Sequence, residues 1–578
     1  MAEAIISPGV FQIESDQSLY TQAPPALGAA IVGPTVKGRP LVPTYVTTYS
    51  QYLSIFGDVF KSGSYYYEYF TSQAAKEYFA NGGQTLLVTR IISGSANIGT
   101  YATSNVAAYG AVNPALTSSF QLETLAWGDQ MNNTSSLSNG ALASGSSQNV
   151  RWEVTNVSTG SGTFTVVVRR GDDNDSQKNI LETWANVSLD PQLPNYISRV
   201  IGDLKPVYVP ATGTDSAYIQ YQGNYANASQ YVRVSAVTTP NVDSLDNNGF
   251  FKSGSFANTL PAVGSGSYGG SFSGGKADTN VTKSMNEAIT ATNIQGFAPA
   301  DYNLAFNLLT NRDEYQFNVL LAPGVGLDCA AANTMIATVE GRGDAIAITD
   351  AGVYGTPIST ATATAAGQSS NYAATYYPWV QLYSANLGKT VWCPPSTVIG
   401  GVLAFNDQVG AEWFAPAGLN RGGIPSVVRA ERRLSQTDRD TLYSANVNPL
   451  ATFPGTGVCV WGQKTLQHKP TALDRVNVRR LLIALKDFIG GISRGLVFEQ
   501  NTTVTRNRFL SQVNPYLESV VQRQGLYAYK VIMDDTNNTP DVVDRNQLVG
   551  QIYIQPTKTA EFIILNFNIL PTGATFPA

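Results

Sequence analysis

The chain has 578 residues, of which 13% are charged, and its formal net charge at pH 7 is −5. This length is several times that of a usual domain, so we expect several domains and a large buried core. Lysine and arginine form no tract, and this excludes the electrostatic footprint of a nucleic-acid-binding protein.

The first 20 residues form an apolar segment that precedes any recognisable domain. They lack the basic and continuous apolar regions of a secretory signal. No apolar run elsewhere approaches the roughly 20 residues that a membrane-spanning helix requires, so we expect neither secretion by this route nor membrane insertion. We interpret residues 1–20 as an N-terminal strand-like arm. The side chains expected to make its contacts are Ile6, Val10, Phe11 and Ile13.

Residues 21–92 alternate buried-strand runs with helical spacing, which predicts the N-terminal part of an α/β core. A helix is expected to start near Thr48, and a second one within residues 67–83 is expected to stop at Gly82-Gly83. The predicted strands cover residues 29–32, 41–46 and 84–91.

Residues 93–276 differ in composition, because loops rich in Ser, Gly and Asn separate short alternating strands such as 151–158 and 162–170. We interpret this part as an inserted, outward-facing β-rich region. The α/β pattern then resumes over residues 277–455, where residues 331–350 predict a helix, a glycine turn and a strand.

Residues 456–578 are predicted to form a C-terminal α+β domain. Val478, Leu482, Leu485 and Ile489 recur with the spacing of an amphipathic helix. Thr471 and Asp474 have the spacing of a capping box before this helix, and Gly490-Gly491 predict its end.

Three strands are expected after this helix, over residues 525–533, 548–556 and 561–570. The last one lies in a predicted C-terminal arm of about residues 556–578, and the sequence alternates so that one face is apolar. The side chains on that face are Ile563, Leu565, Phe567 and Ile569.

Residues suited to catalysis or metal binding are few. A serine hydrolase needs an imidazole base, and the only histidine, His468, stands beside a lysine and a proline. The three cysteines are far apart and odd in number, which is typical of neither a disulfide framework nor a zinc site and favours a reducing compartment. We expect no enzymatic activity, no cofactor and no metal.

Two short motifs are interpreted as turns. The acidic cluster of Asp172, Asp173 and Asp175 lacks the glycine and distal glutamate of a calcium loop, so we expect a solvated turn. Arg342-Gly343-Asp344 spells an integrin-binding tripeptide but lies between a predicted helix and a predicted strand.

Four basic residues lie on or near the predicted C-terminal helix. A solvated polar face and a charged docking surface are both compatible with them. They are Arg475, Arg479, Arg480 and Lys486.

Several stretches resemble contractile tail sheath proteins of T4-type phages, in the order in which that family carries them. Those near the start are "SPGVF", "AAIVGPTVKG", "YLSIFG" and "EYFANGGQTLLVTRI". The central ones are "VSLDPQLPNYISRVIGD", "YYPWV" and "VWCPPSTVIGGVLAFNDQVGAEWFAPAG". The last are "GVCVWGQKTL", "DRVNVRRLLIALK", "NNTPDVVDRNQLV" and "YIQPTKTAEFIILNF".

This resemblance implies a structural subunit that stacks as hexameric rings around a tail tube and contracts to drive the tube through the host envelope. It implies a subtilisin-like middle domain within 277–455, an inner domain within 456–578, and terminal arms that add strands to neighbouring subunits. The implied partners are further copies of the chain, the tail tube, the baseplate and tail terminator proteins. The implied place is the virion tail, assembled in the host cytoplasm, with the four basic residues as possible contacts to the tube.

Two other functions are compatible with parts of the sequence. The same motifs permit the sheath of a contractile bacteriocin or of a cellular injection system. A receptor-binding adhesin or surface-layer protein would explain the Ser/Thr/Asn-rich β region, but not the absence of a secretion signal.

Overall fold

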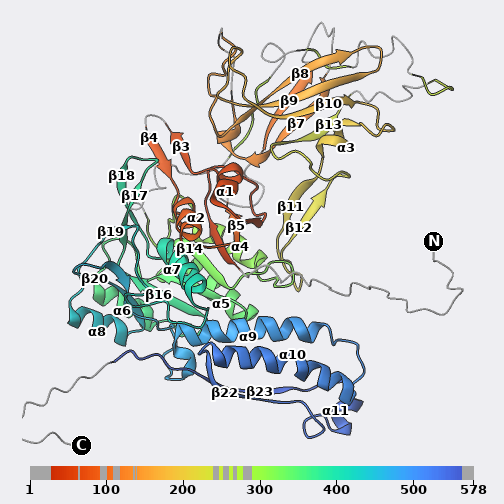
Figure 1. Cartoon of the computed structure of the whole chain (residues 1–578). Coiled ribbons are helices and arrows are strands. Elements are labelled where there is room, and N and C mark those ends of the chain that lie inside the picture. Colours follow the sequence, from red (N-terminus) through yellow and green to blue (C-terminus); the bar gives the residue numbers. More distant parts are fainter. Residues whose placement is uncertain are drawn as a thin grey trace, which may run out of the picture.

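The computed structural model describes residues 28–62, 65–91, 101–107, 118–133, 137, 139–238, 246–250, 260–263, 270–276 and 289–562. Figure 1 shows an α/β body with a β-rich region beyond one end and a pair of long helices along the opposite end. The mixed α and β composition predicted for the chain is confirmed.

One sheet forms the centre of the body. Its inner strands are parallel, while β2 and β21 pair antiparallel at its two edges. Because Ala29 of β1 pairs with Val319 of β14, the segments before and after the inserted region build the same sheet. Its order is β2 (Thr44–Val46), β5 (Leu86–Arg90), β1 (Ala29–Gly33), β14 (Val319–Gly326), β15 (Ile346–Asp350), β16 (Ala373–Tyr377), β20 (Val447–Phe453) and β21 (Gly457–Val460).

Helices cover both faces of this sheet, as parallel sheets require. On β14, Leu320 packs into one hydrophobic cluster with α4, α5 and α6, while Leu321 packs into another with α1, α2 and α7. The helices are α1 (Tyr49–Phe56), α2 (Phe70–Ala80), α4 (Pro299–Leu308), α5 (Ala330–Arg342), α6 (Ile358–Ala366), α7 (Ser396–Val409) and α8 (Gln436–Ser444). Smaller sheets pair β3 (Val59–Ser62) with β4 (Tyr65–Glu68), and β17 (Val380–Ser384) with β18 (Lys389–Cys393) and β19 (Val427–Ala430).

Local signals predicted several element ends correctly. Thr48 caps α1 by accepting a hydrogen bond from the Gln51 amide, and α2 ends at Ala80, with Asn81 as its C-cap before Gly82-Gly83. Gly343 ends α5 in the left-handed conformation with φ of 72°, which an L side chain adopts only with strain. The strand predicted over 41–46 was too long, because only Thr44–Val46 pair with β5. A boundary at 455/456 falls in the turn between β20 and β21.

The inserted region is β-rich, as predicted, and lies away from the central sheet (Figure 1). Two antiparallel sheets, β13-β7-β6 and β10-β9-β8, share one hydrophobic core that contains Phe120, Trp152 and Phe164. The elements are β6 (Tyr101–Ala107), β7 (Ser118–Trp127), β8 (Val150–Ser158), β9 (Thr163–Arg170), β10 (Ile180–Ser188), α3 (Ile197–Ile201), β11 (Lys205–Val209), β12 (Tyr218–Gln222) and β13 (Val232–Val237).

The C-terminal part packs two long helices on a small hairpin. Its elements are α9 (Val476–Arg494), α10 (Thr503–Gln522), β22 (Leu526–Ile532), α11 (Pro540–Asp544) and β23 (Gln551–Pro556). Leu481 and Leu485 of α9 share a buried cluster with Phe509 and Val513 of α10. In Figure 1, α9 and α10 run side by side at the end of the body opposite the inserted region.

Both predicted ends of α9 were wrong. Thr471 caps a separate short 3₁₀ turn, and α9 begins only at Val476. The helix continues through Gly490-Gly491, because Ile492 beyond them still packs against the cluster shared with α10. This tertiary contact offsets the roughly 1 kcal/mol that each glycine costs inside a helix.

Candidate functional site at the base of the C-terminal arm

The chain returns from β23 to the body through residues 557–562, and Glu561 holds it there. Arg475, directly before α9, donates from Nε to Glu561 Oε1 at 2.7 Å and from Nη2 to Oε2 at 3.0 Å. The Tyr443 hydroxyl of α8 donates to Glu561 Oε2 at 2.7 Å. Gln463 Nε2, which follows β21, donates to Glu561 Oε1 at 3.2 Å and to Thr559 Oγ1 at 2.6 Å. One carboxylate thus joins the arm base to the middle and C-terminal parts.

The electrostatics of this cluster favour the ionised carboxylate. Burial alone would raise the pKa of Glu561, but hydrogen bonds from Arg475 and Tyr443 lower it below its ordinary value. Burial and the bond to Glu561 raise the pKa of Tyr443, which keeps its hydroxyl protonated as a donor. Lys464 adds a second cation, 4.4 Å from the centre of the Tyr443 ring. The carboxylate therefore stays ionised and paired at neutral pH, and we call this cluster of Glu561 with Arg475, Tyr443 and Gln463 the latch.

The predicted inter-subunit contact residues lie outside the described residues. At the C-terminal end, the described chain stops at Phe562, whose side chain is 79% exposed directly after the latch. Residues 563–578 therefore start from a point that the latch holds on the body. The contact residues in question are Ile6, Val10, Phe11, Ile13, Ile563, Leu565, Phe567 and Ile569.

The other basic residues of α9 bind within the chain. Arg480 is buried and forms a two-point ion pair with Asp407 of α7, at 2.7 and 2.6 Å. Arg479 is also buried; it donates to the backbone and side-chain oxygens of Asn371 and stacks over the Tyr372 ring. Lys486 is more open and donates to the Tyr372 hydroxyl at 3.1 Å. Contact of these residues with a tube stays a prediction.

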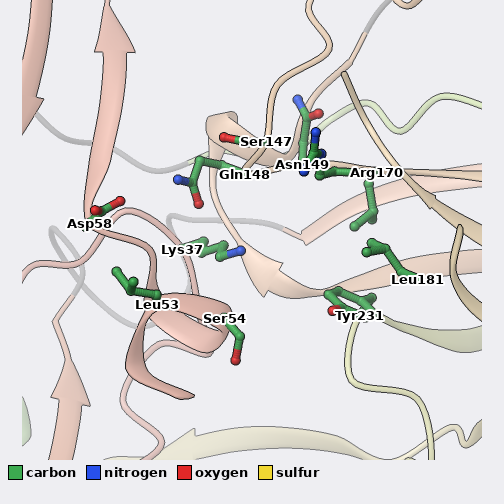
Figure 2. Close-up of a pocket in the computed structure, with 11 residues that line it drawn as sticks. Lys37, Leu53, Ser54, Asp58, Ser147, Gln148, Asn149, Arg170, Leu181 and Tyr231 are labelled. Carbon is green, nitrogen blue, oxygen red and sulfur yellow. The ribbon is translucent and has the colours of Figure 1, made fainter. Parts of the chain in front are cut away.

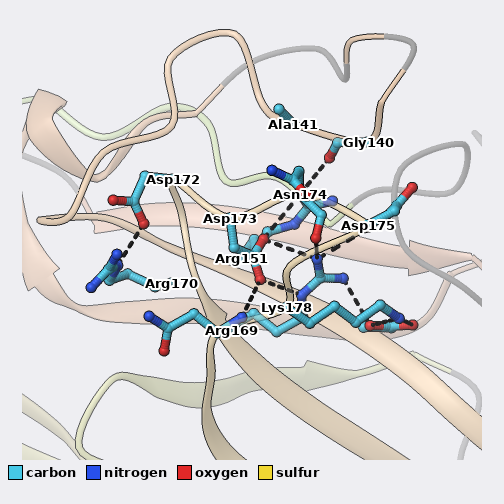
Figure 3. A network of polar contacts seen from close by, with 12 residues as sticks. Gly140, Ala141, Arg151, Arg169, Arg170, Asp172, Asp173, Asn174, Asp175 and Lys178 are labelled. Carbon is cyan, nitrogen blue, oxygen red and sulfur yellow. Dashed lines mark hydrogen bonds and ion pairs between the residues drawn. The ribbon is translucent and has the colours of Figure 1, made fainter.

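The acidic cluster of the inserted region is only partly the solvated turn that we predicted. Asp172 and Asp175 are 32% and 61% exposed, but Asp173 is buried. Arg169 donates to both Asp173 oxygens, at 2.7 and 2.9 Å, and Arg151 lies 3.4 Å away (Figure 3). The prediction was wrong for Asp173 because its partners Arg151 and Arg169 lie on β8 and β9, and only the pairing of these strands brings both guanidinium groups to its carboxylate. The guanidinium groups of Arg169 and Arg151 already contact the Asp173 carboxylate oxygens that a calcium ion would need.

The remaining motifs have structural partners. Arg342 is buried, donates to the carbonyls of Leu309 and Tyr315 and pairs with Asp344, so the Arg-Gly-Asp motif forms a turn, as predicted. His468 is exposed and its Nε2 lies 2.7 Å from the Gln368 carbonyl. Across the described ranges, no three His, Cys, Asp or Glu side chains are grouped as metal ligands. None of the helices described here is long and apolar enough to cross a membrane.

The central and C-terminal parts of the chain match the models of two known protein domains. Residues 295–466 match the phage tail sheath protein central domain, and residues 468–570 match the phage tail sheath C-terminal domain. The resemblance to contractile phage tail sheath proteins is thereby confirmed, and the chain carries both of these sheath domains. The matched family is a structural one and not an enzyme family.

Two relatives show the extent of the likeness. The tail sheath protein of Enterobacteria phage T4 is 41% identical and that of Vibrio phage KVP40 is 40% identical, each over 185 residues. In both cases the match covers 32% of this chain and 28% of the relative, so less than a third of each relative is spanned. The sheath tail protein of Listeria innocua is 12% identical, with a TM-score of 0.53 over 92% of this chain and 95% of that one. At this identity the likeness shows a shared fold.

Proposed function

We propose that this chain is the structural subunit of a contractile tail sheath, which polymerises as stacked hexameric rings around a tail tube. Its contraction drives the tube through the host envelope. The observation that carries the proposal is the match of residues 295–570 to the central and C-terminal sheath domains. The likeness to the Listeria innocua sheath fold over nearly the whole chain supports it.

The proposal includes the partners and the place of action. The subunit would bind further copies of itself, the tail tube, the baseplate and the tail terminator proteins, within a virion tail assembled in the host cytoplasm. The parallel sheet with helices on both faces supports a subtilisin-like fold for the middle domain, without its chemistry. Both relatives named above are phage proteins, which favours a phage tail over a bacteriocin.

Assembly in this proposal depends on the two arms. Residues 1–20 and 556–578 would add strands to sheets of neighbouring copies, with backbone hydrogen bonds supplying affinity and alternate side chains supplying register. Such a head-to-tail contact propagates as a helix. The Arg475–Glu561 latch sets the point on the body from which residues 563–578 start. During contraction the rings would rotate as rigid bodies while the strand pairings between subunits persist.

Electron microscopy of the purified chain tests the proposal. We expect hollow tubes from the full chain and folded monomers after removal of residues 1–18 or 563–578. Circular dichroism spectra that match the full chain would show that each truncated chain is folded. Tubes formed by both truncated chains would contradict the role of the arms. Monodisperse monomers of the full chain, even after the tube protein is added, would contradict the sheath function itself.

A further inference from the structure

A pocket of about 290 Å³ lies at the joint between the α/β body and the inserted region (Figure 2). The body contributes Lys37, from the segment after β1, and the α1 residues Leu53 and Ser54. The inserted region contributes the segment 147–150, together with Arg170 at the end of β9, and the facing side chains of Leu181 and Tyr231. Residues distant in sequence thus build one pocket.

Lys37 carries a cation into this pocket. Figure 2 shows its ammonium group pointing into the space between α1 and the inserted region. Within the described part of the chain, the ammonium group has no hydrogen bond or ion pair. The nearest acidic lining residue is Asp58, but its carboxylate accepts from the Asn386 side chain at 2.9 Å and from the Val59 amide at 2.7 Å. Asp58 is thus committed to other partners.

The opposite wall of the pocket is also rich in donors. Arg170 uses its Nε for Asp172 at 2.5 Å, and its guanidinium group is 42% exposed beside the pocket. A guanidinium group has further N–H donors besides Nε. Burial raises the pKa of Tyr231, with a further contribution from Glu182, so its hydroxyl stays a neutral donor. The wall therefore offers hydrogen bonds to a negatively charged group.

Burial of the Lys37 ammonium has an electrostatic cost. It lowers the pKa of Lys37 to about 8, and the charge of Asp58 only partly opposes this effect. An anion beside the ammonium would supply a counterion and raise the pKa again.

We propose that this pocket binds a small anion, with a carboxylate or a tetrahedral oxyanion between Lys37 and Arg170. The volume lies at the lower limit of the roughly 300–1,000 Å³ typical of ligand pockets, so the ligand is small. Since one cation comes from the body and the other from the inserted region, the bound anion ties the two together. The proposal is independent of the sheath function.

Titration calorimetry on the full chain tests the site, with sulfate and acetate as probes at pH 6.5 and constant ionic strength. We expect saturable binding of at least one anion and at least ~10-fold weaker binding by Lys37→Met, because the ammonium is a principal contact. Lys389→Met is the matched control, since Lys389 is exposed on β18, and it should bind like the wild type. Sulfate binding alone would identify a tetrahedral oxyanion, and acetate binding alone a carboxylate.

The pH dependence gives a second readout. Both probes keep their charge between pH 6.5 and 9.5, whereas a lysine with a pKa of about 8 is only ~3% protonated at pH 9.5. Affinity should therefore fall ~30-fold in the wild type and stay constant in Lys37→Arg, whose guanidinium remains charged. No binding of either anion by the wild type, or equal binding by Lys37→Met, would overturn the proposal.

Discussion

Arg475 and Glu561 lie 86 residues apart in the chain and form a two-point ion pair, with N–O distances of 2.7 and 3.0 Å. This pair joins the start of α9 to the base of the C-terminal arm. The arginine and glutamate side chains are 25% and 18% exposed, so solvent screens part of their attraction. The latch therefore has a larger consequence for the direction of the arm than for the stability of the body.

Glu561→Ala should release the arm base while the body stays folded. We expect a loss of ~1 kcal/mol in the free energy of unfolding and a marked loss of tube assembly. A double-mutant cycle with Arg475→Ala measures the coupling of the pair in urea denaturation. Lys558→Ala, close in sequence but outside the latch, is the control for assembly. Normal tubes from Glu561→Ala would show that the latch does not direct the arm.

The latch should also weaken in acid. Because the folded pKa of Glu561 is lowered, its stabilising effect is present above the unfolded-state pKa of about 4.5 and is lost as the pH falls through the folded value. Glu561→Gln should therefore differ from the wild type at pH 7 and approach it near pH 3. A difference in urea midpoint that is the same at both pH values would contradict this assignment.

Asp407→Ala should destabilise the packing of α9 on α7. It leaves the Arg480 guanidinium, 2% exposed, without its partner, at a cost of ~3 kcal/mol. The double variant Asp407→Leu/Arg480→Met should recover most of this loss, because neither charge then remains buried. Lys486→Met, which loses one hydrogen bond to Tyr372, should cost less than ~0.5 kcal/mol in urea denaturation. An equal cost for Asp407→Ala and Lys486→Met would refute the buried-pair explanation.

The burial of Arg480 also decides which variant can report on tube docking. Charge reversal at Arg480 breaks an internal pair, so lost assembly would reflect a damaged fold. Lys486→Glu is the informative change, since within the described residues its side chain has a single hydrogen bond to lose, the one to the Tyr372 hydroxyl. If Lys486 touches the tube, this variant should form tube-free polysheath but not sheathed tubes by negative-stain microscopy. Normal sheathed tubes would return Lys486 to a solvated surface role.

Asp173→Ala should unfold the inserted region at lower temperature. Arg169 is fully buried and loses two of its carboxylate contacts, at a cost of ~3 kcal/mol. Asp175→Ala, in the same turn but 61% exposed, should change the free energy of unfolding by less than ~0.5 kcal/mol. Calorimetric scans of both variants make the comparison, and equal shifts would contradict the burial argument.

Asp350→Asn should remove a pH dependence from the body. Burial raises the pKa of Asp350 to about 7, although its carboxylate accepts from the Ser396 hydroxyl and amide. The folded state therefore binds the proton more tightly, and this group lowers the free energy of unfolding as the pH rises from about 4 to about 7. The slope is at most ~1.4 kcal/mol per pH unit. Urea midpoints at pH 5 and 8 should differ less in the variant than in the wild type.

Elements with local signals could be predicted from the sequence. The Thr48 cap, the stop at Gly82-Gly83 and the turn at Gly343 each depend on side chains or backbone freedom within a few residues. The inserted β-rich region was likewise visible in its composition and alternation. The length of α9 was not, because glycines that would end an isolated helix are held by packing against α10.

The alternation of helices and strands, the apolar pattern of the arms and the order of the sheath motifs can be predicted from neighbouring residues along the chain. The pairing of Arg475 with Glu561, the pairing of Arg480 with Asp407 and the burial of Asp173 beside Arg169 follow from the folded structure alone. The spacing of charged residues carries no signal for partners distant in the chain. When such residues are buried, they form internal ion pairs instead of remaining solvated charges, and which residues are buried depends on the fold of the whole chain.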